Sequence, residues 1–170
     1  MLATGDSGTV KIFSNKDYQA VMEVQGACEA GFSCAWDSQG LKFAVGGQDG
    51  FVSIWDIRKF GGKNWSSSKL YSTQKGPKGA VRCVKFSMSM SMDLLVYSEH
   101  CSYINVVDTR DFNKERQSIL ITPQSGVDLH LSGLAFTPDS QRLVVASEQN
   151  LYEFQVNSIQ RRSFPSICPI

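Results

Sequence analysis

Residues 32–58 read FSCAWDSQGLKFAVGGQDGFVSIWDIR. Alternating apolar and polar residues lead to Trp36, a short turn-forming segment follows, and a second apolar run precedes the pair Asp49-Gly50. A third apolar run occupies 51–57. A period of two is typical of half-buried β-strands, and Asp-Gly between two such runs is typical of a tight hairpin turn. The stretch therefore predicts antiparallel strands joined by short turns.

The same unit returns further along the chain, at residues 81–110 and 131–156. The aromatic residue that closes its first run recurs every 50 residues, as Trp36, Phe86 and Phe136. Matching positions in the third run are Phe13, Trp55, Val107 and Phe154. Self-similarity of this kind is the signature of a repeat architecture. We expect similar groups of strands to follow one another along the chain.

The expected strands fall into four groups. They are 1–4, 9–14 and 19–25; 32–36, 41–47, 51–57 and 69–74; 80–86, 93–99, 103–109 and 117–122; and 131–136, 142–148, 151–156 and 160–164. No segment keeps a helical period over about ten residues. The predicted fold class is therefore all-β.

Composition restricts the function. The 170 residues are 42% hydrophobic and 19% charged with a net charge of +1, which favours a globular chain without a general attraction for nucleic acid or anionic membranes. No apolar run approaches the roughly 20 residues of a membrane span. The five cysteines have no paired spacing, which argues against disulfides and zinc. We expect a cytoplasmic or nuclear protein.

These units resemble the WD repeat, and Ile54-Trp55-Asp56 contains its signature dipeptide. WD repeats of about 40–45 residues form the four-stranded blades of a β-propeller. The resemblance implies that residues 1–170 are a single propeller segment of about four antiparallel blades. The blades are expected at about 1–25, which is incomplete, and at 32–74, 80–122 and 131–164.

The polar residues depart from the family pattern. Many WD repeats contain a buried network between a Gly-His before the first strand and an Asp in the tight turn. Here Ala27, Pro77 and Val127 stand where that His would be. We therefore expect these blades to depend more on apolar packing than on buried polar contacts. Asp49 is expected to be a turn residue that bonds its own backbone beside Gly50.

The number of blades is also unusual. Propellers close with about 4–8 blades, whereas three blades and part of a fourth are expected here. Residues 2–5 match the second strand of a blade, without a first strand before it. Because an open ring leaves strand edges unpaired, we interpret the chain as the C-terminal part of a longer protein or a truncated product. The alternative is a half-propeller that closes with a second copy.

A narrower resemblance involves four segments, which are DLLVYSEH at 93–100, VVDTR at 106–110, LSGLAFTPD at 131–139 and RRSFP at 161–165. Their order and spacing are similar to those of the C-terminal domain of unknown function in uncharacterised eukaryotic, notably fungal, WD-repeat proteins. That group has no assigned activity. The resemblance therefore supports the fold and leaves the function open.

Catalytic patterns are missing from the sequence. The two histidines are His100 and His130, and Glu99-His100-Cys101 is the segment closest to a Cys-His pair. Neighbouring residues of a strand point to opposite faces, so His100 is not expected to activate Cys101. No phosphate loop, HExxH or GxSxG sequence occurs. We expect no enzymatic activity, no cofactor and no metal, with His100 as a surface turn residue.

Residues 43–58 resemble the docking box of substrate receptors of a cullin-type ubiquitin ligase. The final Arg of that box, here Arg58, contacts the propeller adaptor of the ligase, and a planar guanidinium suits such a contact. A second, weaker version ends at Arg110. The alternative is an ordinary WD repeat that ends in Arg, because most of the box is what a propeller strand pair requires.

Two features outside the repeats have competing interpretations. Arg161-Arg162 beside Phe164 could stack on nucleic acid, but the low net charge favours a charged outer strand that discourages edge pairing. Trp65 lies in a Gly/Ser-rich insertion, where it either anchors a partner or folds back onto its blade. We favour the folded-back position.

The expected function is a non-catalytic protein–protein interaction scaffold that presents blade loops to a protein partner of unknown identity. The alternative is a ubiquitin-ligase substrate receptor, whose partner is the ligase adaptor. Neither a membrane nor nucleic acid is an expected partner. The candidate contact residues are Asp49, Arg58, Trp65, His100 and Arg110.

Overall fold

The computed structural model describes residues 1–24, 29–59, 69–73, 76, 78–89, 92–121 and 127–157. These residues form β-strands and one short 3-10 helix, η1 (Ile57–Lys59), and they contain no α-helix. In this part of the chain no helix is long and apolar enough to cross a membrane. The all-β fold class is confirmed.

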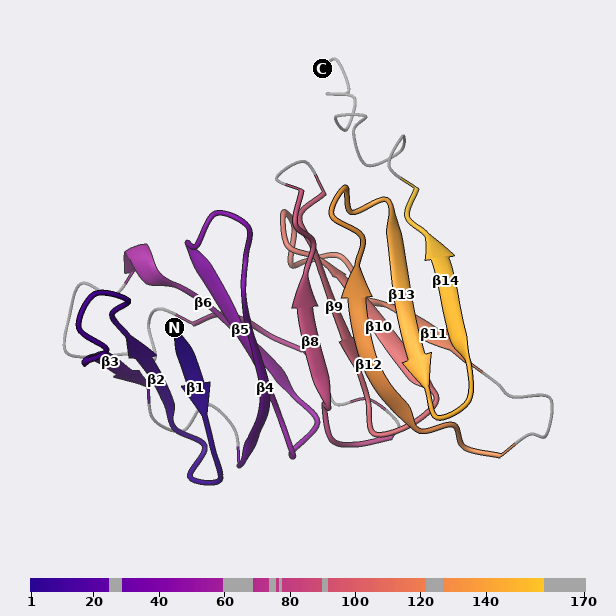
Figure 1. Cartoon of the computed structure of the whole chain (residues 1–170), viewed down its shortest axis with the longest axis horizontal. Coiled ribbons are helices and arrows are strands. Elements are labelled where there is room, and N and C mark those ends of the chain that lie inside the picture. The colour runs from indigo at the N-terminus through magenta and orange to yellow at the C-terminus, as the bar shows by residue number, and fades with distance from the viewer. Residues whose placement is uncertain are drawn as a thin grey trace, which may run out of the picture.

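The strands form four antiparallel sheets that lie side by side in chain order along the long axis of the molecule (Figure 1). The first sheet contains β1 (Leu2–Thr4), β2 (Val10–Phe13) and β3 (Ala20–Val24). The second contains β4 (Gly31–Trp36), β5 (Lys42–Gly47), β6 (Val52–Asp56) and β7 (Lys69–Ser72). The third contains β8 (Cys83–Phe86), β9 (Leu94–Ser98), β10 (Tyr103–Asp108) and β11 (Gln117–Leu120). The fourth contains β12 (Leu131–Phe136), β13 (Arg142–Ser147) and β14 (Leu151–Gln155).

Within each sheet every strand pairs with its neighbour in sequence. The first strands β4, β8 and β12 contact one another in series, and β1 contacts β4. Meander sheets that pack face to face in this way, the first of them with three strands, form part of a β-propeller. The predicted partial propeller is therefore the observed architecture.

The predicted strands agree with the observed ones to within a few residues, except that the strand expected at 160–164 lies outside the described residues. The largest difference concerns β8, which begins at Cys83 rather than at residue 80. The backbone N–H of Val81 donates to the carbonyl of Gly47 in the second sheet, at 2.9 Å. The residues before β8 therefore bind to the second sheet, and the chain joins the third sheet only at Cys83.

Three apolar layers hold the sheets together. The layer between the first and second sheets contains Val10 and Phe43, and the next contains Ile54 and Tyr97. The third layer, between the third and fourth sheets, contains Leu131 and other aliphatic residues. Burying a side chain of this size contributes about 1.5–3 kcal/mol. Packing between sheets is therefore the main source of stability.

The Trp-Asp dipeptide at the end of β6 contributes to both the core and the strand end. The Trp55 side chain is 2% exposed and stacks on Phe43, with 5.1 Å between ring centroids and 14° between ring planes. Asp56 follows at the end of the strand. Because strand side chains alternate between faces, Trp55 packs toward the first sheet while Asp56 is left to bind a polar partner.

The third sheet contains a buried polar network that the sequence patterns do not predict. Glu99 and Asn105 are both 0% exposed, and the Asn105 amide donates to the Glu99 carboxylate at 2.8 Å. The backbone N–H of Lys78 donates to the same carboxylate at 2.7 Å, and the Ser118 hydroxyl donates to Asn105. Glu99 thus supplies a buried carboxylate where the sequence has no turn Asp, and the third sheet combines apolar packing with a buried polar network.

Candidate functional site

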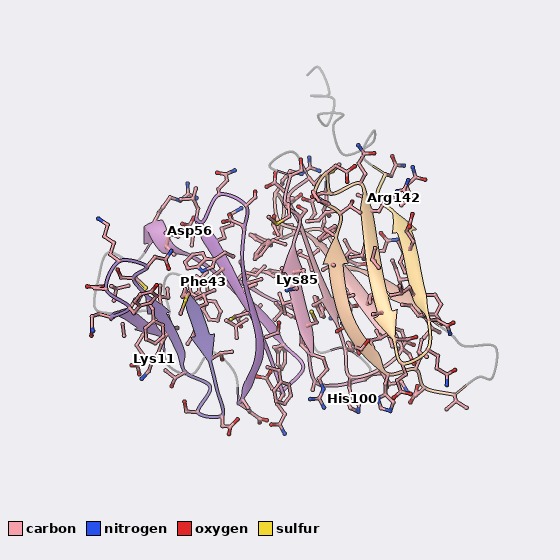
Figure 2. All side chains as sticks on the ribbon, viewed as in Figure 1. Lys11, Phe43, Asp56, Lys85, His100 and Arg142 are labelled. Atoms are coloured by element: carbon pink, nitrogen blue, oxygen red, sulfur yellow. The ribbon has the colours of Figure 1, made fainter. Side chains whose placement is uncertain are left out.

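The side chains of interest lie at the two opposite ends of the sheets (Figure 2). The "Arg58 end" consists of the turns at 37–41 and 137–141 and the segments that follow β6 and β10. The "His100 end" consists of the turns at 48–51 and 99–102 and the segments that precede β4, β8 and β12. Figure 2 shows Asp56 near one end and His100 at the other. The predicted contact residues are thus split between two surfaces.

At the Arg58 end, Asp56 holds Arg58 in a two-point fork. Nε of Arg58 donates to Oδ1 of Asp56 at 2.9 Å, and Nη2 donates to Oδ2 at 2.6 Å. The backbone N–H of Arg58 also donates to Oδ1, at 2.9 Å. The hydrogen bond from the Arg58 side chain is the main reason why the pKa of Asp56 lies below its usual value. The Arg58 side chain remains 59% exposed, so part of it is accessible to a partner.

The same fork recurs one sheet further along. Nε and Nη2 of Arg110 donate to the two carboxylate oxygens of Asp108, both at 3.2 Å. The Arg110 side chain is 38% exposed, and the hydrogen bond to Asp108 raises its pKa. Lys42 of the second sheet donates to the carbonyl of Thr109, beside this fork, at 3.4 Å. This contact links the second and third sheets beside the Arg110 fork, and Lys42 is the register partner of Asp56 in the neighbouring strand.

Asp49 behaves as the turn residue that the sequence predicts. Its Oδ1 accepts the backbone N–H of Phe51 at 3.2 Å, and Gly50 has a φ of +85°. Glycine adopts this left-handed conformation without the steric cost that other residues have. The contact role proposed for Asp49 stays a prediction.

His100 belongs to a row of side chains that crosses three sheets. Nε and Nη2 of Arg82 lie 3.3 Å and 3.2 Å from Nδ1 of His100. The guanidinium also lies over the ring of Phe32, 4.8 Å from its centroid. On the other side, the rings of His100 and His130 meet edge to face, with 5.5 Å between centroids. We call Phe32, Arg82, His100 and His130 the His100 row.

Neither Arg82 nor Phe32 was among the contact residues expected from the sequence. The 50-residue interval of the repeat contained a usable signal, because it places Phe32 and Arg82 at equivalent positions in successive units. Equivalent positions at the start of β4 and β8 are neighbours when these strands pack against each other. His100 lies in the turn between β9 and β10, at the same end of the sheets, so including the residues of that turn would also have identified it.

Cys101 is a poor candidate for a nucleophile. Its side chain is buried, and burial is the main cause that raises the pKa of its thiol. A thiol of raised pKa supplies little of the reactive thiolate. No cluster of three or more His, Cys, Asp or Glu side chains that could hold a metal occurs among the described residues.

A cleft of about 530 Å³ lies between the third and fourth sheets. It is lined by apolar side chains that include Leu94, Phe136, Leu143 and Phe154, and by amide side chains such as Gln117. The residues that line it include no acid, base or thiol. The cleft can therefore take up apolar groups, and its described lining offers no group for acid–base chemistry.

Two predicted features lie outside the described residues, namely Trp65 and the basic pair Arg161-Arg162. The candidates that the structure places are therefore Arg58 and Arg110 at one end, and Asp49 and His100 at the other. The structure does not bring all of them into one site.

Residues 24–56 match the family described as WD domain, G-beta repeat. This segment is therefore similar to a WD repeat. Residues 79–120 match a second family, described as Uncharacterised protein domain (DUF2415). The WD repeat includes the Trp55-Asp56 dipeptide, and the second match includes the Asp108-Thr109-Arg110 segment. Both resemblances found in the sequence are thus confirmed.

The chain is also similar to the Uncharacterized protein C4G3.03 of Schizosaccharomyces pombe, with 27% identity over 175 aligned residues. The alignment covers 98% of the chain and 49% of the relative, so the chain spans about half the length of this curated relative. The WD repeat supports a role as a protein-interaction scaffold, because proteins of this kind act in general through their surfaces rather than by catalysis.

Proposed function

We propose that the chain is a non-catalytic scaffold that binds proteins through side chains at the ends of its sheets. The observation that carries this proposal is the repeated Asp–Arg fork, in which Asp56 and Asp108 fix Arg58 and Arg110 on neighbouring sheets. A guanidinium that is already held in place loses less conformational freedom on binding, and its remaining donors suit a carboxylate or a carbonyl. The two forks would act as paired anchors for one partner.

The test compares variants of the natural full-length protein by affinity purification and quantitative mass spectrometry. In the test variant, Arg58→Gln is combined with Arg110→Gln, and the matched control is Arg142→Gln, an exposed arginine that pairs with Glu153 in the fourth sheet. We expect the double variant to lose at least one partner that the wild type and the control retain. Identical partner lists for all three proteins would contradict the proposal.

The finer alternative is a substrate receptor of a cullin-type ubiquitin ligase that docks through Trp55-Asp56-Ile57-Arg58. The exposure of Arg58 at a strand end supports it, and the buried Trp55 and the fork from Asp56 would orient the side chain. A pull-down with the purified ligase adaptor tests it by comparing wild type with Arg58→Ala. Recovery of the adaptor should fall at least fivefold, and equal recovery would rule out this role.

We also propose that the protein resides in the cytoplasm or the nucleus. The described cysteines Cys34, Cys83 and Cys101 are free thiols, which suits a reducing compartment. Fluorescence microscopy of the tagged protein tests this, and localisation to the secretory pathway would contradict it.

We further propose that the four sheets form one propeller segment, for which a single cooperative unfolding transition is the expected result.

A further inference from the structure

The His100 row lies at the end of the sheets away from the Asp–Arg forks. Phe32 comes from β4, Arg82 from the segment before β8, His100 from the β9–β10 turn, and His130 from the residue before β12. All of these side chains are exposed, and Phe32 is 40% exposed. The row therefore connects the second, third and fourth sheets in one continuous surface.

Arg82 differs in its surroundings from three other arginines, which are Arg58, Arg110 and Arg142. Arg58, Arg110 and Arg142 each pair with a carboxylate within 4 Å. The side-chain contacts of Arg82 are with the Phe32 ring and His100, and no carboxylate lies within 4 Å of it among the described residues. Its positive charge is thus held between two rings, and the part of the chain that the structure describes gives it no carboxylate partner.

The carboxylate of Asp128, near His130 in sequence, pairs with Lys78 rather than with Arg82. Asp128, two residues before His130, binds the Lys78 ammonium at 2.7 Å and accepts from the Ser102 hydroxyl at 3.3 Å. The hydrogen bond from the Lys78 side chain is the main reason why the pKa of Asp128 is lowered. The Asp128 carboxylate is therefore paired with Lys78.

The row presents hydrogen-bond donors to solvent. When Nδ1 of His100 accepts from Arg82, the neutral imidazole carries its proton on Nε2, which is then a donor. The guanidinium has five N–H groups, and those on Nη1 are not used by His100. A carboxylate accepts hydrogen bonds and donates none when ionised, so it complements these donors. The exposed ring of Phe32 next to them suits an apolar side chain.

We infer that the His100 row is a docking site for an acidic segment of a protein partner, in which a carboxylate lies beside an apolar side chain. This inference rests on the scaffold function proposed above. It adds the His100 row as a second binding surface and names the kind of partner segment that this surface would bind. A protein segment is favoured over nucleic acid, because neutralising a phosphate backbone takes several cations and the row contains a single guanidinium. Arg82 would bind the carboxylate, with Phe32 and His100 keeping the guanidinium in position.

The test measures binding of fluorescein-labelled peptides to the full chain by fluorescence anisotropy. The probe is a peptide of repeated Gly-Glu-Phe-Glu units, and its neutral counterpart has Gln in place of each Glu. A labelled oligothymidine serves as the nucleic-acid probe. The test variant is Arg82→Gln, and the matched control is Arg142→Gln. Far-ultraviolet circular dichroism and the unfolding midpoint verify that both variants keep the fold.

The acidic peptide should bind the wild type, with a Kd that rises at least fivefold for Arg82→Gln and changes less than twofold for Arg142→Gln. The neutral peptide should bind at least fivefold more weakly than the acidic one. The inference is overturned if the two peptides bind equally, if Arg82→Gln leaves binding unchanged, or if the oligothymidine binds more tightly through Arg82.

A failure of this test leaves the scaffold proposal standing, because the Arg58 and Arg110 variants examine the opposite end of the sheets. Conversely, loss of the scaffold proposal would appear as identical partner lists for the Arg58 and Arg110 double variant, which does not alter the His100 row. The two sets of variants therefore give separable results. Replacing His100 by Gln gives an added check, because the amide oxygen of Gln can still accept from Arg82 and should preserve binding to within about threefold.

Discussion

The amide of Asn105 donates a hydrogen bond of 2.8 Å to the carboxylate of Glu99, and neither side chain has any exposed surface. Glu99 lies at the start of the β9–β10 turn and Asn105 lies in β10. The carboxylate also accepts the N–H of Lys78, in the segment that leads into β8. A buried ionisable group thus connects the turn, the strand and the segment between two sheets.

Replacing Glu99 with Ala should lower the free energy of unfolding by about 3 kcal/mol, because the Asn105 amide and the Lys78 N–H would lose their buried acceptor. Glu99→Gln should have a smaller effect, since the amide oxygen replaces one acceptor while the NH₂ group faces a donor. Urea denaturation followed by circular dichroism measures both changes.

The matched control for this prediction is Glu153→Ala. Glu153 is exposed and pairs with Arg142 on the surface of the fourth sheet, and exposed ion pairs contribute about 0–1 kcal/mol. We expect a clear difference between the two alanine variants. Equal losses would mean that the Glu99 network does not stabilise the third sheet more than a surface ion pair does.

The strand order was predictable because it depends on local patterns. Alternating apolar residues, turn sequences such as Asp49-Gly50, and the 50-residue interval are all visible along the chain. The start of β8 was not predictable, since the Val81 N–H binds Gly47 in another sheet. The Glu99 network was also missed, because its acceptor and its Lys78 donor are 21 residues apart and meet only in the folded chain.

The candidate site was predicted in pieces. Asp56 and Arg58 are two residues apart in sequence, so their strand-end position could be foreseen, although the fork itself could not. The His100 row joins residues of three sheets, and its contacts depend on how the sheets pack. The sequence shows Arg82 as one basic residue among several, and only its place between Phe32 and His100 makes it distinctive.

Gly46 and Gly133 offer a test of the packing between sheets. A methyl group on Gly46 would lie 2.3 Å from Cγ1 of Val81, whereas one on Gly133 would have no atom within 4 Å. We expect Gly46→Ala to destabilise the fold by about 1–3 kcal/mol through overpacking. Gly133→Ala should be neutral or stabilising by up to about 1 kcal/mol, because it reduces the freedom of the unfolded chain.

Thermal unfolding of the two glycine variants gives the measurement. The expected order of midpoints is Gly133→Ala at or above wild type and Gly46→Ala below it. The opposite order would show that the close contact between β5 and the Val81 segment is not present in solution.

Trp55 should be the aromatic residue that the layer between the first and second sheets depends on most. It is 2% exposed and stacks on Phe43, so Trp55→Ala should cost about 3–5 kcal/mol. Phe51→Ala is the control, because Phe51 is 38% exposed and its removal should cost less than about 1 kcal/mol. Chemical denaturation compares the variants, and similar losses would contradict the packing of this layer.

The fork between Asp56 and Arg58 should make the free energy of unfolding depend on pH. The hydrogen bond from Arg58 lowers the pKa of Asp56 in the folded chain. The pKa of an Asp side chain in the unfolded chain is about 3.9. A carboxyl group whose folded-state pKa is depressed stabilises the fold above the unfolded pKa, and this contribution is lost as the pH falls through the folded pKa. Wild type should therefore exceed Asp56→Asn in stability at pH 7, by an amount on the order of 1 kcal/mol.

That difference should shrink once the pH falls below about 4, where the unfolded carboxyl group takes up its proton. Urea unfolding midpoints of wild type and Asp56→Asn at pH 7 and pH 3 measure it. Asp49→Asn is the control, because Asp49 accepts the N–H of Phe51 in a turn rather than an arginine side chain, and Asn can accept that bond as well. If the gap between wild type and Asp56→Asn is the same at both pH values, the Asp56 carboxylate does not stabilise the end of β6 through its charge.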